Sequence, residues 1–203
     1  MSRQKRPVTT VTVVISLVGA AIVGGVALYP PGGRVRSVVE PAPGARAESA
    51  RISTPIPAGM RQMTLPQDEG LTAPGGTAEL AIQAQGVVLV GAADQPGRPG
   101  SALIAVTAES PDPHVVTEEG CSAWGAQVTR SRAGQTLPFR WARVVSSPRG
   151  PRCELKLGDE RGGLTQVYWQ DGPAAFRLTA MGRDPLLDLA IRDVVEGTRI
   201  TSP

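Results

Sequence analysis

The sequence has few of the residues from which catalytic and metal sites are most often built. It contains one histidine, two cysteines and only 3% aromatic residues among 203 positions. A structural zinc site needs about four His, Cys or carboxylate ligands, and one His114 with two distant cysteines does not supply them. No Walker loop and no Rossmann glycine fingerprint is present. The sequence therefore predicts neither a metal site nor a bound cofactor.

Strong charge of one sign is also missing. The net charge is +3, and the basic residues are scattered along the chain. Binding to nucleic acid depends on a concentrated basic surface, so we expect no nucleic-acid partner. With so few aromatic residues, the core must be built from valine, leucine, isoleucine and alanine.

The first 36 residues are organised as an anchor for a membrane. Arg3, Lys5 and Arg6 precede an uncharged, largely apolar run from Val8 to Tyr29, and Arg34 and Arg36 follow it. A run of about 22 apolar residues is long enough to cross ~30 Å of hydrocarbon. The excess of positive charge before the run predicts a cytoplasmic N-terminus and an extracytoplasmic C-terminal domain.

A cleaved signal peptide is the alternative interpretation of the same segment. Its apolar region would be shorter and would end in a small-x-small cleavage site, for which Gly25-Val26-Ala27 qualifies. The length of the run favours the anchor. We therefore expect a tail over 1–7, a transmembrane helix over 8–29, a Pro-rich linker over 30–50 and one domain over 51–203.

Cys121 and Cys153 are the two cysteines of this domain. An even number of cysteines in an exported domain predicts a disulfide, here worth about 3–4 kcal/mol in the chain-entropy model. The alternative is a reactive thiol, which needs a nearby base or positive charge, and the only histidine, His114, lies seven residues before Cys121.

Short apolar runs separated by Gly, Pro and Asp turns fill the rest of the domain. We expect strands over Arg51–Ile56, Ala78–Ala84, Val87–Val90, Ala102–Thr107, Ala126–Arg130, Pro138–Val145, Glu154–Leu157, Leu164–Trp169 and Ala175–Met181. Many short strands at this spacing predict an all-β barrel or sandwich. Residues 184–195 fit either a helix capped by Asp184 and Pro185 or a loop followed by a strand.

Six segments share a common order with one known β-barrel family. They are Arg51–Gly59 (RISTPIPAG), Leu65–Pro74 (LPQDEGLTAP), Pro96–Ser110 (PGRPGSALIAVTAES), the hairpin residues of 133–145, Asp171–Arg183 (DGPAAFRLTAMGR) and Arg192–Val195 (RDVV). Taken together they resemble the sortases, and most of all the actinobacterial class F type. This resemblance implies a small closed barrel with short helical pieces, preceded by one transmembrane helix.

Sortases are cysteine transpeptidases, so the resemblance also implies a Cys nucleophile, a His acid/base and an Arg that steadies the oxyanion. In this sequence the His position is Thr107 and the Cys position is Met181, and only Arg192 keeps its residue type. A thioether is not a nucleophile of this kind, and threonine does not shuttle protons near neutral pH.

The leading hypothesis is therefore a membrane-anchored, sortase-like domain that has lost catalysis and binds a peptide or surface protein of the cell envelope. Two alternatives stay open. One is an active transpeptidase that uses a displaced set of Cys121 or Cys153 with His114. The other is a structural or sensory envelope domain unrelated to sortases.

Overall fold

The computed structural model describes residues 42–64, 76–91, 102–131, 137–159, 162–182 and 187–201. The chain divides into two units, Met1–Arg36 and Ser37–Pro203, and all described residues belong to the second. The predicted tail, anchor and most of the linker lie outside the described residues. In the part that is described, no helix combines the length and the apolar character needed to cross a membrane.

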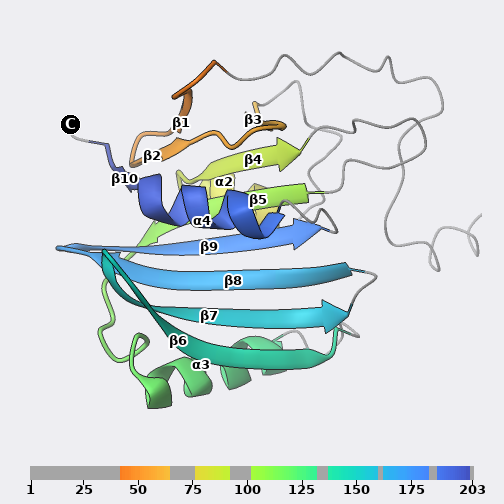
Figure 1. The fold of residues 1–203 in the computed structure, drawn as a ribbon, viewed down its shortest axis with the longest axis vertical. Helices are drawn as coiled ribbons and strands as arrows, with labels where there is room; N and C mark the ends of the chain where they lie inside the picture. Colours follow the sequence, from red (N-terminus) through yellow and green to blue (C-terminus); the bar gives the residue numbers. More distant parts are fainter. Residues whose placement is uncertain are drawn as a thin grey trace, which may run out of the picture. The chain divides into compact units, whose positions relative to one another are not determined.

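The described part is mostly antiparallel β-sheet with three helices (Figure 1). The strands are β1 Arg46–Glu48, β2 Ile52–Pro55, β3 Met60–Gln62, β4 Val87–Gly91, β5 Ala102–Glu109, β6 Phe139–Ser147, β7 Gly150–Asp159, β8 Gly162–Asp171, β9 Ala174–Gly182 and β10 Arg199–Ile200. The helices are α2 Thr77–Gln83, α3 Glu118–Ser131 and α4 Leu187–Gly197.

These strands form two open sheets, so the predicted closed barrel is wrong. One sheet has the order β3-β4-β5-β9-β8-β7-β6 and the other has the order β1-β2-β10. The reason lies in two segments, Ala78–Ala84 and Ala126–Arg130, that were expected to be strands. They belong to the helices α2 and α3 instead, which cover the sheet rather than extend it. The fold is therefore β-rich but not all-β.

The two faces of the seven-stranded sheet carry different helices. Successive strand residues point to opposite faces, and along β9 the side chains of Phe176, Leu178 and Ala180 enter one hydrophobic cluster with α4. Ala175, which points to the opposite face, belongs to a second cluster with Cys121 and other residues of α3. In Figure 1, α4 lies in front of the sheet, whereas α3 lies behind β6 and β7. The helix α2 packs on β4 and β5 over a third cluster.

The described part of the ambiguous segment 184–195 is a helix, α4, and the expected cap at Asp184 and Pro185 lies outside the described residues. Its apolar positions recur at helical spacing, and Leu187, Ala190, Ile191, Val194 and Val195 are buried against the sheet. The strand β1 pairs with β2. Because β1 falls inside 30–50, the ordered domain takes in the last residues of the segment that the sequence predicted as linker.

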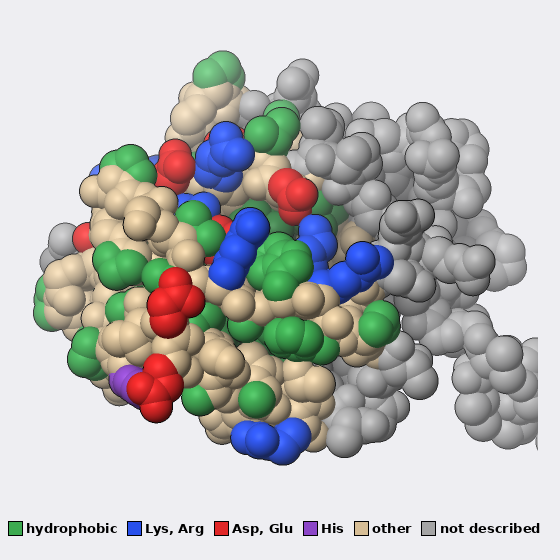
Figure 2. All heavy atoms as spheres, turned by 60° about the horizontal axis from the view of Figure 1, so that its bottom comes forward, with side chains coloured by type: hydrophobic (Ala, Val, Ile, Leu, Met, Phe, Trp, Pro, Cys, Tyr) green, Lys and Arg blue, Asp and Glu red, His purple; other side chains and the backbone are tan. Residues whose placement is uncertain are grey.

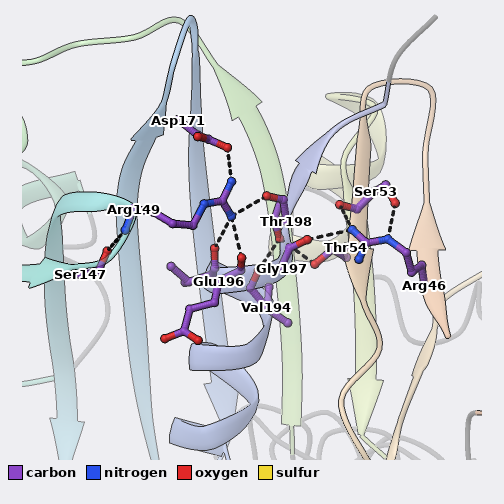
Figure 3. Close-up of polar contacts among 11 residues, drawn as sticks. Arg46, Ser53, Thr54, Ser147, Arg149, Asp171, Val194, Glu196, Gly197 and Thr198 are labelled. Atoms are coloured by element: carbon purple, nitrogen blue, oxygen red, sulfur yellow. Dashed lines mark hydrogen bonds and ion pairs between the residues drawn. The ribbon is translucent and has the colours of Figure 1, made fainter. Parts of the chain in front are cut away.

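Two arginines hold the C-terminal end of α4 (Figure 3). Arg149, in the β6–β7 turn, donates hydrogen bonds to the carbonyl oxygens of Val195, Glu196 and Thr198 and forms an ion pair with Asp171. Arg46 of β1 donates to the carbonyl oxygen of Gly197 at 2.8 Å. Positive groups at a helix C-terminus satisfy the unpaired carbonyl oxygens and interact favourably with the negative end of the helix dipole.

Candidate functional site

A cleft of about 420 Å³ opens between α3, the end of β5 and the loop that joins them. This volume lies within the range of small-ligand sites. Its residues come from four elements and one loop: Glu109 from β5, Asp112 and His114 from the loop, Trp124 and Arg130 from α3, Tyr168 from β8 and Arg177 from β9.

Arg177 is one of the residues that line this cleft. Its Nη2 donates to Oε2 of Glu109 at 2.9 Å, and its guanidinium carbon lies 5.8 Å from the centre of the Trp124 ring. Its Nε is buried and has no hydrogen-bond partner among the residues that the structure describes. An unpaired buried donor costs free energy. The side chain as a whole is 38% exposed, so donors of its guanidinium group other than the buried Nε remain open to the cleft.

The wall opposite β5 is fixed by the loop that leads into α3. The Tyr168 hydroxyl accepts a hydrogen bond from the backbone N–H of Asp112 at 2.7 Å. Thr117 is the N-cap of α3, because its Oγ1 accepts from the N–H of Gly120 at 3.1 Å. A Cβ added to Gly120 would lie 1.8 Å from the carbonyl oxygen of His114, so only glycine fits there.

A disulfide joins Cys121 of α3 to Cys153 of β7, as the sequence predicted. The two Cα atoms are 5.4 Å apart, and both side chains are buried. Cys121 lies one turn before Trp124, so this bond fixes the part of α3 that presents Trp124 to the cleft. While it is intact, neither cysteine offers a thiol.

The cleft also holds the residue types of a hydrolytic triad: Ser110, Asp112 and His114. Oδ1 of Asp112 accepts from the backbone N–H of His114 at 3.0 Å, whereas a triad would join it to the imidazole ring. No hydrogen bond links the side chains of these three residues to one another in the described structure. Within the described residues, no three His, Cys, Asp or Glu side chains form a group able to hold a metal ion.

The three positions implied by the sortase resemblance are not brought together. Thr107 pairs with Arg177 across β5 and β9, whereas Met181 pairs with Leu103, four residues further along β9. Four strand residues span about 13 Å. Arg192 is exposed on α4, which packs on the opposite face of the sheet.

Sequence reasoning did not single out Arg177, Glu109, Trp124 or Tyr168. One signal was available, since Arg177 is the only charge inside the apolar run of β9. A lone charge in a half-buried strand indicates a specific partner. That partner, Glu109, is 68 residues away and only the strand register reveals it.

No family model and no curated sequence matches the chain. Among solved structures, it is similar to LpqN of Mycobacterium tuberculosis, which is involved in cell envelope biogenesis. The TM-score is 0.42 and the identity 16%, over 79% of this chain and 87% of LpqN. This is a loose likeness of fold, and the resemblance to sortases stays a prediction.

Proposed function

We propose that the protein is a membrane-anchored, extracytoplasmic domain that binds a peptide component of the cell envelope without cutting it. The cleft at Arg177 receives a carboxylate of that peptide. The N-terminal anchor expected from the sequence would hold the domain at the membrane surface. The resemblance to sortases supports a surface peptide as the ligand class, and the loss of Cys and His at Met181 and Thr107 supports binding without transpeptidation.

The observation that carries this proposal is the state of Arg177. Glu109 takes one end of the guanidinium group, and the buried Nε remains without a partner. The Arg177 side chain is nevertheless 38% exposed, so a carboxylate in the cleft can reach its remaining N–H donors beside Glu109. The Trp124 ring at 5.8 Å supplies an apolar surface next to these donors. Together they suit a carboxylate that is attached to an apolar side chain or backbone.

The charge balance of the cleft favours a single negative group. Arg130 and Arg177 face Glu109 and Asp112 among the lining residues. The ion pair with Glu109 already offsets part of the charge of Arg177. A ligand with several negative charges would therefore meet stronger repulsion from the two acids than one carboxylate, such as a peptide C-terminus, would.

The test compares two forms of one short apolar peptide, with a free C-terminal carboxylate and with a C-terminal amide, against the full chain in detergent. We expect calorimetry to show the free acid binding about tenfold more tightly, because only the acid pairs with Arg177. Arg177→Gln should remove this preference. Arg192→Gln, which removes the same charge from α4, should keep it.

Two results would overturn the proposal. One is equal binding of acid and amide by the unaltered chain. The other is turnover of LPxTG-type or other envelope peptides that disappears in Cys153→Ser or Ser110→Ala, since that would show a nucleophile at work in this domain.

A further inference from the structure

The strand β6 is a free edge of the seven-stranded sheet. It pairs with β7 on one side, and no described residue pairs with it on the other. Figure 1 shows it at one end of the sheet, with the much shorter β3 at the other end. Along an edge strand, every second residue directs its N–H and C=O groups away from the sheet. A nine-residue edge can therefore pair with a further extended chain.

A bulge in β6 places Phe139 and Trp141, two residues apart, on opposite faces of this edge strand. The register between β6 and β7 shifts between Phe139 and Trp141. Phe139 lies on the α3 side, where its ring would be 3.7 Å from a Cβ placed on Gly125, and it is half exposed. Trp141 points to the other face, where the guanidinium of Arg143 lies 4.2 Å from its ring centre. One face of the edge is thus apolar and the other is aromatic and basic.

Positive charge is concentrated on the β6–β7 hairpin. The described side chains of this hairpin include five basic groups, Arg140, Arg143, Arg149, Arg152 and Lys156, and one acid, Glu154. Glu154 accepts from Arg152 at 2.9 Å and from Arg143 at 3.4 Å. The side chain of Arg143 is 59% exposed. Because Arg143 shares the Glu154 carboxylate with Arg152, its positive charge is only partly balanced and remains available to a partner. Figure 2 shows basic side chains around hydrophobic ones on this side of the domain.

The same charge argues against a second copy of this chain at the edge. Arg143 is the central residue of β6. Two β6 strands that paired antiparallel about their centres would place Arg143 directly opposite its own copy. Like charges directly opposite each other destabilise a strand pair. A strand with an acid at that position would instead be attracted.

We propose that β6 binds an extended acidic segment of a partner protein as an added strand. The acids of that segment lie beside Arg143 on one face, and its alternate, apolar residues lie beside Phe139 on the other. The backbone of β6 supplies the hydrogen bonds and the two faces supply the selectivity. This surface is built from residues that do not line the cleft at Arg177, so the two proposals stand or fall separately.

The test uses labelled seven-residue peptides of alternating Glu and Val, or alternating Lys and Val, and the full chain in detergent. Fluorescence anisotropy should show binding of the Glu–Val peptide, weakening as salt is added. Arg143→Glu should lower that affinity about tenfold and raise the affinity for the Lys–Val peptide. Arg143→Gln should lie between, and Arg192→Glu on α4 should change neither affinity.

A second measurement separates strand addition from simple charge attraction. N-methylation of alternate peptide residues on the bonding edge removes backbone donors and keeps every charge, so it should abolish binding. Equal binding of the methylated and unmethylated peptides would overturn the proposal. So would an unchanged affinity in Arg143→Glu, or a dimer of the unaltered chain that occupies β6. Arg177→Gln, which alters only the cleft, should bind the Glu–Val peptide normally.

Discussion

The helices α3 and α4 pack on opposite faces of one sheet, and the chain fastens them by different chemistry. α3 is joined to β7 by the bond between Cys121 and Cys153. α4 is held at its C-terminal end by hydrogen bonds from Arg149 and Arg46 and by an apolar stripe of five buried residues. α3 buries fewer apolar side chains, since Cys121, Trp124 and Val128 are its buried hydrophobic residues and a glycine lies at its centre.

This difference predicts which side of the domain is sensitive to the redox conditions around it. The cleft at Arg177 is bounded by α3, so the wall of the proposed binding site depends on an oxidising compartment. The α4 side depends on charge and on packing, and should be indifferent to redox state. Four substitutions test this division, beginning with the largest expected effect.

Replacing both Cys121 and Cys153 by alanine should cost about 3–4 kcal/mol of unfolding free energy, because the unfolded chain regains the freedom that the cross-link removed. Urea unfolding of the full chain in detergent measures it. Hydrogen exchange should show α3 losing protection while α4 keeps it. The unaltered chain in a reducing agent is the matched control and should behave in the same way. Equal loss of protection in both helices would contradict the division.

The outcome also bears on how far sequence predicts this structure. The disulfide, the strands β5, β8 and β9 and the helical alternative for α4 are all visible as local patterns. α3 was missed, although Thr117 followed by Glu118 and Glu119 is a helix start signal and Cys121, Trp124 and Val128 recur at helical spacing. Barrel closure is not a local property, since it depends on whether distant strands meet at the edges.

The cleft was beyond sequence reasoning for a related reason. Arg177 lies more than 50 residues along the chain from Glu109 and Trp124 and meets them only through the register of β5 with β9 and the docking of α3. Conversely, Thr107 and Met181 lie in their expected strands but are four residues apart in register. Residue type at an aligned position does not fix its neighbours in space.

Arg149→Met should cost about 2 kcal/mol, because three carbonyl oxygens at the end of α4 lose a charged donor while the apolar stem is kept. Arg192→Met, on the exposed side of the same helix, should have little effect. Urea unfolding measures both variants. Here hydrogen exchange should rise at the C-terminal turn of α4 and not in α3. A larger increase in α3 would show that the two faces are coupled more strongly than their separate fastenings suggest.

A buried pair of hydroxyl groups provides a further test of how the C-terminal end of α4 is attached. Oγ1 of Thr54 and Oγ1 of Thr198 lie 2.7 Å apart, and Thr198 also donates to the carbonyl oxygen of Val194 (Figure 3). Thr198→Val alone should cost about 1–2 kcal/mol, because it leaves the buried Thr54 hydroxyl without its partner, whereas Thr54→Val should cost less, because Thr198 keeps its hydrogen bond to Val194. The double variant should cost less than the sum of the two, since no hydroxyl is then stranded. Additive losses would mean that the pair contributes nothing as a pair.

The smallest change in stability is expected from Arg199, whose positive charge lies near that of Arg46 beside the end of α4. Burial lowers the pKa of Arg46, the nearby Arg199 lowers it further, and Glu48 acts in the opposite direction. A lowered pKa means that desolvation and repulsion from Arg199 disfavour the charged form in the folded state, against the hydrogen bonds by which Arg46 stabilises the end of α4. Arg199→Gln should therefore raise the urea midpoint slightly near neutral pH. The gain should shrink in high salt, which already screens the two arginines from each other. A loss of stability, or a gain independent of salt, would show that Arg199 supports β10 by packing rather than opposing Arg46 by charge.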